Sequence, residues 1–257
     1  MFSDFPYIFN PSIPPRTGGI FTAHSLPRRE IQSAFEASCV GKGSIITVSG
    51  PSGIGKTELL KDIEAEFSLS GATPVVITCD PATESGATTL RKLINSMSVM
   101  FPGMNSHIVE EMYHLSNEDN YLRLSDRVHV DNVIRKVALQ VLSQVFIKND
   151  EDLDTPEVFI LRNCHFNDYV FWQFFNTMAT ILTDHPTRIC PAIWLVETHD
   201  ENALTVTLPS PERHHLVKLL GFDSDETNAM LSSLLGLTPF PEEPNSWACK
   251  ISEGIPR

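Results

Sequence analysis

Short apolar runs alternate with amphipathic segments along most of the chain. The runs are rich in β-branched side chains and carry few charges, which is typical of strands covered on both faces in a parallel sheet. The segments between them place apolar residues three and four positions apart, a spacing that predicts helices. The alternation of strands and helices therefore predicts an α/β fold with a mostly parallel, five-stranded sheet. The expected strands are 44–49, 74–79, 157–161, 192–196 and 215–219, and the expected helices are 27–40, 57–67, 88–100, 130–146, 168–182, 224–235 and 244–252.

Other segments lack this patterning. Residues 1–20 contain several prolines and a Gly18-Gly19 pair, so we expect an extended leader. Residues 101–128 show little apolar periodicity and are expected to form a loop or an insertion. Residues 148–155 are mostly acidic and are expected to form a solvated turn.

The chain carries 32 acidic against 19 basic residues, a formal net charge of −13. This balance argues against a nucleic-acid-binding surface, because duplex binding depends on clustered Lys and Arg. Five cysteines lie far apart without a CxxC pair, so we expect buried, reduced thiols rather than disulfides or a zinc site. No apolar run approaches the roughly 20 residues that a membrane span needs. We therefore expect no membrane partner and an intracellular, cytoplasmic location.

The expected strand 44–49 leads directly into a glycine-rich loop that precedes the expected helix 57–67. The loop matches the pattern GxxxxGK[ST], which cradles nucleotide phosphates when it lies between a strand and a helix. The backbone N–H groups of such a loop and the positive end of the following helix attract an anion. Lys56 is expected to contact the β and γ phosphates, and the Thr57 hydroxyl is expected to bind Mg²⁺. We therefore predict ATP and Mg²⁺ as ligands, held by Gly50, Pro51, Ser52, Gly53, Ile54, Gly55, Lys56, Thr57 and Glu58.

The run GPSGIGKTELL, which begins at Gly50, resembles the AAA-type ATPase domains described as origin-recognition-complex-like, and the related signal-transduction NTPases called STAND. The resemblance spans about residues 21–257, and Gly254-Ile-Pro256 is similar to the Gly-x-Pro element of STAND proteins. It implies a three-layer α/β/α P-loop NTPase fold with a small C-terminal helical lid, from which Pro256 approaches the nucleotide. The implied organisation is a leader at 1–20, a nucleotide-binding domain at 21–220 and a partial lid at 221–257. Relatives continue beyond this element, which is compatible with a longer parent protein.

The second acidic motif of this family is changed in the chain. The family has an apolar strand ending in Asp, commonly followed by Leu-His-Trp-Ala-Asp, whereas the matching residues here run from Arg162-Asn163 to Asp168. A neutral Asn163 polarises Mg²⁺-bound water weakly and orients the attacking water poorly, so we expect nucleotide binding with slow or absent hydrolysis. Asp168 either substitutes through a water or caps the next helix. Together with Lys56, these two residues are the catalytic candidates.

The resemblance also implies a γ-phosphate sensor at the end of the fourth expected strand. Thr198 and His199 occupy that place, where relatives carry a polar residue or Arg. Capping of the strand end is the alternative role for both residues.

The sequence favours a nucleotide-dependent regulatory switch of the STAND type, with a protein partner or self-association. An active AAA-type ATPase is the alternative. It would need a hydrolytic acid and usually an Arg finger from a neighbouring subunit, and Asn163 argues against it. A small-molecule P-loop kinase is a further alternative, with Asp80 as the base toward a substrate hydroxyl. The intact loop residues disfavour a scaffold that has lost its nucleotide.

Overall fold

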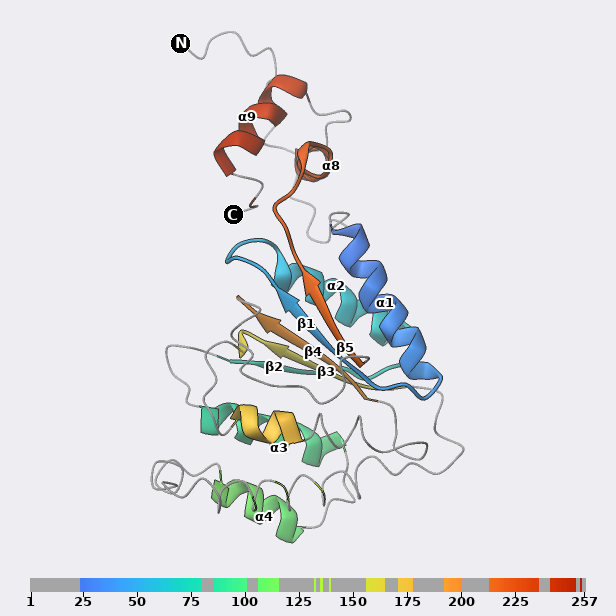
Figure 1. The fold of residues 1–257 in the computed structure, drawn as a ribbon, viewed down its shortest axis with the longest axis vertical. Coiled ribbons are helices and arrows are strands. Elements are labelled where there is room, and N and C mark those ends of the chain that lie inside the picture. The colour runs from blue at the N-terminus through green and yellow to red at the C-terminus, as the bar shows by residue number, and fades with distance from the viewer. Residues whose placement is uncertain are drawn as a thin grey trace. The chain divides into compact units, whose positions relative to one another are not determined.

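The computed structural model describes residues 24–79, 86–100, 106–115, 132, 135, 139, 156–164, 171–177, 192–199, 213–235, 241–252 and 255 (Figure 1). These residues form two compact units. One lies within Leu26–Leu219, and the other comprises His24, Ser25 and the described part of Leu220–Arg257.

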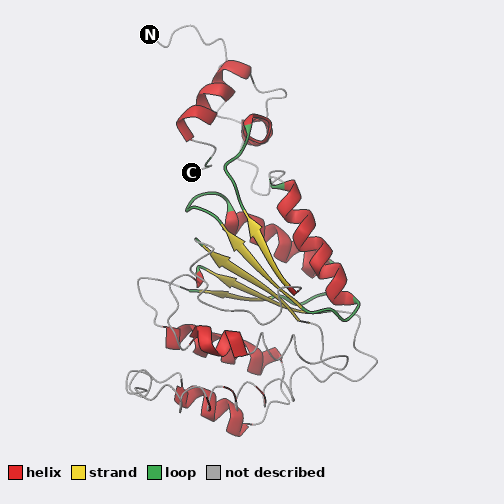
Figure 2. Ribbon diagram, viewed as in Figure 1, coloured by secondary structure: helices red, strands yellow, loops and turns green. Residues whose placement is uncertain are grey.

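The strands of the larger unit run parallel in one sheet: β1 (Ser44–Ser49), β2 (Val75–Thr78), β3 (Glu157–Arg162), β4 (Ala192–Thr198) and β5 (His214–Lys218) (Figure 2). The strand order is β2-β3-β4-β1-β5, so β1 lies between β4 and β5. Every residue of β1 and of β4 is buried, as expected of parallel strands covered on both faces. The prediction of a mostly parallel, five-stranded sheet is confirmed.

Helices α1 (Ser25–Cys39) and α2 (Lys56–Leu69) cover one face of this sheet (Figure 1). The rings of Phe35 on α1 and Phe67 on α2 stack with their centroids 4.0 Å apart. Arg28 of α1 forms an ion pair with Glu66 of α2. The two helices are therefore joined by an apolar and a charged contact, and α2 is held where it follows the glycine-rich loop.

The other face of the sheet is covered by α3 (Gly86–Met100) and the helical residues 171–177 (Figure 1). Trp194 of β4 stacks on Phe159 of β3 at 4.2 Å and meets the edge of Phe175 at 5.4 Å. These aromatic contacts fill the core between the sheet and that helical layer. The three-layer α/β/α arrangement predicted from the sequence is confirmed.

The smaller unit contains α8 (Ser224–Leu235) and α9 (Glu242–Ser252). A capping box starts α8: the Asp223 carboxylate accepts from the backbone N–H groups of Asp225 and Glu226, and the Glu226 carboxylate accepts from the Asp223 N–H. Asn245 on α9 is buried and donates to the backbone carbonyl of the first residue of α8, 3.0 Å away. Among the described helices, none is long and apolar enough to cross a membrane.

The structure corrects part of the expected loop at 101–128, because α4 (Ser106–Leu115) lies within it and packs beside α3 (Figure 1). The sequence places Ile108, Met112 and Leu115 at helical spacing, a short pattern that the surrounding polar residues obscured. The other predicted elements agree closely with the structure where it describes them. The expected leader, the acidic turn and most of the expected helix 130–146 lie outside the described residues.

Candidate nucleotide-binding site

The glycine-rich loop joins the end of β1 to the start of α2. Gly53 and Gly55 have φ angles of 84° and 102°, a left-handed backbone that residues with a side chain rarely adopt. A Cβ on Gly50 would lie 2.9 Å from the carbonyl oxygen of Leu219, the residue that follows β5. The loop therefore has the conformation and the close backbone packing for which the GxxxxGK[ST] pattern selects glycine.

The remaining loop residues divide into a buried anchor and an exposed rim. Ile54 is fully buried, whereas Pro51, Ser52 and Gly53 are exposed, as is Glu58 in the first turn of α2. The apolar anchor holds the loop against the core while its rim stays open to a ligand.

Lys56 is buried, with 3% of the residue exposed, and its ammonium lies along the inside of the loop. Nζ donates to the carbonyl oxygens of Gly50 at 2.7 Å and Pro51 at 3.0 Å. Burial lowers the pKa of Lys56, and the negative charge of Glu197 opposes that shift. A buried cation that is satisfied mainly by neutral carbonyls is well placed to attract an anionic ligand.

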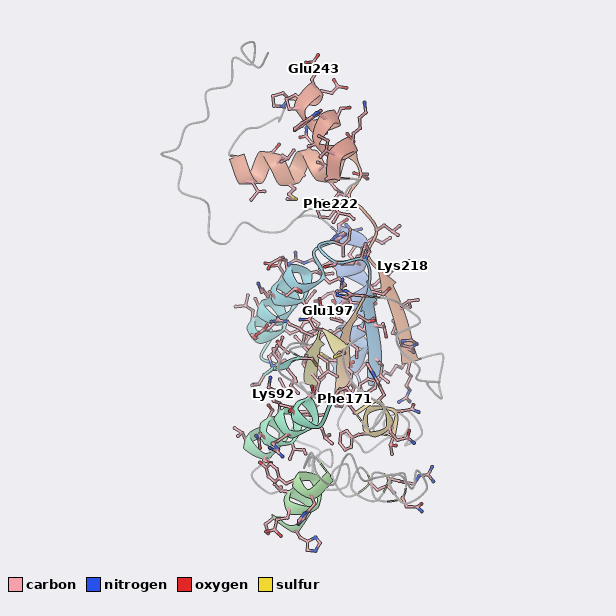
Figure 3. The ribbon with its side chains drawn as sticks, turned by 90° about the vertical axis from the view of Figure 1, so that its left-hand side faces the viewer. Lys92, Phe171, Glu197, Lys218, Phe222 and Glu243 are labelled. Atoms are coloured by element: carbon pink, nitrogen blue, oxygen red, sulfur yellow. The ribbon has the colours of Figure 1, made fainter. Side chains whose placement is uncertain are left out.

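Thr57 and Glu197 meet beside the loop. Thr57 lies in the first turn of α2, and its hydroxyl donates to Oε1 of Glu197 at 2.9 Å. Glu197, which is labelled in Figure 3, is the penultimate residue of β4 and is paired with Val48 of β1. It is only 2% exposed. Its second carboxylate oxygen, Oε2, is buried and has no hydrogen-bond partner among the described residues.

The predicted sensor positions also lie at the end of β4. Thr198 is fully buried and paired with Ser49, the last residue of β1. Nδ1 of His199 lies 3.2 Å from Nζ of Lys56. Burial lowers the pKa of His199, the Lys56 ammonium lowers it further and Glu197 raises it. The lowered pKa favours a neutral imidazole, and in the tautomer with its proton on Nε2 the Nδ1 atom can accept a hydrogen bond from Lys56.

The end of β3 carries a cation rather than an acid. Arg162 is level with Glu197, because Leu161 pairs with Val196 one position earlier. Its guanidinium donates to Oε2 of Glu64 on α2 at 2.7 Å. Asn163, the catalytic candidate that follows, has a φ of 57°, a left-handed conformation that Asn tolerates. The candidates Asp168, Asp80 and Pro256 lie outside the described residues.

Glu197 was missed as a site residue by reasoning from the sequence. The available signal was a single acidic residue at the end of an otherwise apolar, buried strand, where an unpaired charge is costly. Its closeness to Thr57 depends on β4 lying next to β1, which sequence periodicity does not reveal.

The oxygens beside the loop fit a hard divalent cation. Mg²⁺ prefers oxygen ligands and is commonly held by one or two carboxylates together with substrate phosphates. The Thr57 hydroxyl donates a hydrogen bond to Glu197, which leaves the lone pairs of Thr57 Oγ1 available to a cation. The buried Oε2 of Glu197 is a further oxygen ligand. The residues present therefore suit the Mg²⁺ ion that the sequence predicts.

No protein-family model and no curated protein matches the chain. Solved structures do resemble it. They include the Orc1 protein of Aeropyrum pernix in complex with DNA, with 11% identity over 88% of this chain and 50% of that chain and a TM-score of 0.47. Cdc6p from Pyrobaculum aerophilum has 13% identity over 89% of this chain and 52% of that chain, with a TM-score of 0.50. A Walker-type ATPase of Pyrococcus abyssi has 15% identity over 90% of this chain and 63% of that chain, with a TM-score of 0.47.

The chain thus spans about half the length of the first two proteins. At such low identities the likeness concerns the fold alone. Together with the parallel strand order and the glycine-rich loop, it shows that the chain has the fold of an origin-recognition-complex-like AAA P-loop NTPase domain.

Proposed function

We propose that the chain binds Mg·ATP at residues 50–57 and acts as a nucleotide-dependent regulatory switch that hydrolyses ATP slowly or not at all. The loop itself carries this proposal. Its glycines adopt left-handed backbone conformations, and Lys56 is buried with its ammonium bonded along the loop. A phosphate chain supplies the anion that this arrangement lacks.

In this proposal, Lys56 contacts the β and γ phosphates and the first turn of α2 adds its free N–H groups. Thr57 and Glu197 are the residues placed to hold Mg²⁺ beside the phosphates. A bound Mg²⁺ supplies charge neutralisation to the phosphate oxygens. Thr198 and His199 would sense the γ phosphate from the end of β4.

Slow hydrolysis follows from the end of β3. Attack by water on the γ phosphate needs a residue that orients that water and accepts its proton. Asn163 is neutral, and the neighbouring Arg162 is engaged with Glu64. Binding therefore does not depend on these residues, whereas turnover does.

The contact between the loop and the end of β5 supports a switch. The backbone N–H of Leu219 donates to the backbone carbonyl oxygen of Ser49 at 2.8 Å, and the Leu219 carbonyl lies against Gly50. The chain passes from Leu219 directly into the smaller unit at Leu220. A change in the loop on phosphate binding would therefore act on Leu219, which precedes the smaller unit along the chain. ATP would in this way favour one of two conformational states of the protein.

The domain roles belong to the same proposal. Residues 21–220 would bind the nucleotide, residues 221–257 would form a partial helical lid that includes Pro256, and residues 1–20 would be an extended leader. The net charge of −13 favours a protein partner or a second copy of the chain over nucleic acid. A cytoplasmic site of action belongs to the same proposal.

Two further activities remain as alternatives to a slow switch. An active ATPase would need an acid outside the described residues, such as Asp168. A small-molecule kinase would use Asp80 as its base. Turnover of ATP in the absence and presence of added acceptors separates these from the switch.

Equilibrium binding of a fluorescent ATP analogue with Mg²⁺ tests the proposal. We expect micromolar affinity in the wild type and none in Lys56→Ala, which removes the loop cation. Lys61→Ala is the matched control, because Lys61 is an exposed lysine of the same helix that pairs with Glu58. Wild-type affinity in Lys56→Ala would overturn binding at the loop, and no binding in the wild type would overturn nucleotide binding itself.

Single-turnover hydrolysis of γ-labelled ATP tests the second half of the proposal. Slow release of phosphate supports a switch that holds ATP, whereas rapid release points to an active ATPase. Duplex DNA belongs in the same binding series, since the Aeropyrum pernix Orc1 structure is a complex with DNA. We expect no DNA binding at physiological salt.

A further inference from the structure

We infer that Glu197 of β4 is the carboxylate that holds Mg²⁺ together with Thr57, so that β4 supplies the acid that the end of β3 lacks. This inference rests on the proposed binding of Mg·ATP at the loop. It assigns to Glu197 a metal-binding role that the sequence motif places on a different strand.

The surroundings of the carboxylate support this role. Glu197 is 2% exposed, and one of its oxygens accepts from the Thr57 hydroxyl at 2.9 Å. The other oxygen is buried without a hydrogen-bond partner among the described residues. A buried carboxylate oxygen without a partner is energetically unfavourable. Such an atom in a native structure calls for an explanation, and an ion that completes the site is one.

Pairing with Lys56 does not account for the free oxygen. The Lys56 ammonium donates to two loop carbonyls and lies 3.2 Å from His199. Burial lowers the pKa of Lys56, and the negative charge of Glu197 counteracts that lowering without a hydrogen bond between the two side chains. Within the described part of the chain, Glu197 Oε2 therefore accepts no hydrogen bond.

The geometry of the sheet explains why β4 can take this role. Because β4 lies directly beside β1, the pairing of Glu197 with Val48 brings the carboxylate level with the strand end that opens the loop. Side chains alternate along a strand, so Glu197 and Trp194 point to opposite faces. Trp194 packs against Phe175 on the far face, and Glu197 therefore faces α2 and Thr57.

The hydrogen bond between Thr57 and Glu197 also orients the hydroxyl so that its oxygen can bind a cation. The hydroxyl proton is donated to Glu197, so both lone pairs of Thr57 Oγ1 are available to a metal. The carboxylate then fixes the orientation of one ligand and offers its second oxygen to the ion, directly or through a metal-bound water.

The test compares nucleotide affinity in excess EDTA with affinity in saturating Mg²⁺, and the ratio of the two dissociation constants measures metal dependence without any turnover. Glu197→Gln keeps the size of the side chain and an acceptor for Thr57 but removes the charge. We expect its affinity in EDTA to match the wild type, and its metal dependence to fall by about tenfold or more. Glu197→Asp keeps the charge on a shorter side chain, and its metal dependence should lie between those of the wild type and Glu197→Gln.

Glu157→Gln is the matched control. Glu157 is also a buried strand carboxylate, but it is the first residue of β3 and pairs with the first residue of β4, at the end of the sheet away from the loop. Its metal dependence should equal that of the wild type. Thermal unfolding of each variant checks that the fold is intact, and Glu197→Asp carries the test if Glu197→Gln does not fold.

The outcomes separate the two levels of the proposal. Unchanged metal dependence in the Glu197 variants, with nucleotide binding intact, would overturn the role of Glu197 and leave nucleotide binding standing. Loss of affinity in EDTA and in Mg²⁺ alike would assign Glu197 to the architecture of the loop and overturn its role toward the metal. No binding by the wild type under either condition would overturn the proposed function itself.

Discussion

The guanidinium of Arg162 donates to the carboxylate of Glu64 at 2.7 Å, which ties the end of β3 to α2. The Arg162 side chain is only 12% exposed, and that of Glu64 is 36% exposed. The end of β3 therefore fastens the helix that follows the loop. If Glu197 holds the metal as proposed, metal binding lies on β4 and helix attachment on β3.

Removing this attachment should destabilise the protein. Arg162→Ala deletes a largely buried side chain and leaves Glu64 without its partner, so we expect a loss of about 2 kcal/mol in the free energy of unfolding. Denaturant unfolding measures the loss. Lys61→Ala removes the exposed pair with Glu58 on the same helix and should cost at most about 0.5 kcal/mol. Equal losses in the two variants would contradict a structural role for the Arg162 contact.

Restoring an acid after β3 should raise turnover. Asn163→Asp introduces a carboxylate at a position whose left-handed backbone Asp also tolerates. We expect single-turnover hydrolysis to increase by about tenfold or more, because the new carboxylate can orient water and accept its proton. Affinity for Mg·ATP should change little.

The double variant Asn163→Asp with Lys56→Ala is the control for that experiment. It should show no turnover, since nucleotide no longer binds at the loop. Activity in the double variant would trace the hydrolysis to another site or to a contaminant, and an inactive Asn163→Asp would show that position 163 does not face the γ phosphate.

Two glycines with similar steric surroundings separate loop function from sheet stability. A Cβ on Gly50 would lie 2.9 Å from a backbone oxygen of Leu219, and a Cβ on Gly43 would lie 2.9 Å from that of Ala192. Both alanine variants should lower the free energy of unfolding by about 1 to 3 kcal/mol, because backbone atoms have to move. Only Gly50→Ala should also weaken nucleotide binding. Equal affinity in the two variants, measured with the fluorescent analogue, would place the phosphates away from Gly50.

The contact between Thr47 and His214 predicts a loss of stability in acid. Thr47 is fully buried on β1, and its Oγ1 lies 2.8 Å from Nε2 of His214 on β5. Burial, and then the charge of His215, lower the pKa of His214 from its ordinary value of 6.5. The folded protein thus keeps this imidazole neutral at a pH where the unfolded chain binds a proton. Its contribution to stability is fully present above pH 6.5 and falls as the pH drops through the lowered pKa.

His214→Gln removes the titrating group and should reduce the stability lost between about pH 7 and pH 5. Urea unfolding at a series of pH values measures this difference. A wild-type slope in His214→Gln would show that the imidazole does not couple to folding.

Hydrophobic patterning was sufficient to predict the strands and most of the helices, because the sheet buries both faces and β-branched runs such as 44–49 stand out. The loop was predictable because its chemistry resides in consecutive residues from Gly50 to Thr57. Short α4 was not predicted, since its apolar residues are few and the surrounding segment is polar. Glu197 was not predicted because its contact with Thr57 joins residues on different elements.

The pairing of Val48 with Glu197 has a consequence for chains that carry the same loop but no acid after the third strand. In such chains, the residue two positions before the first loop glycine corresponds to Val48. An acidic residue paired with it on the neighbouring strand can lie beside the loop threonine. A shift of one residue between the two strands would turn that side chain to the far face and remove it from the threonine. If Glu197 holds Mg²⁺ as proposed, the absence of the acid after the third strand does not by itself indicate an inactive site, because the neighbouring strand can supply one.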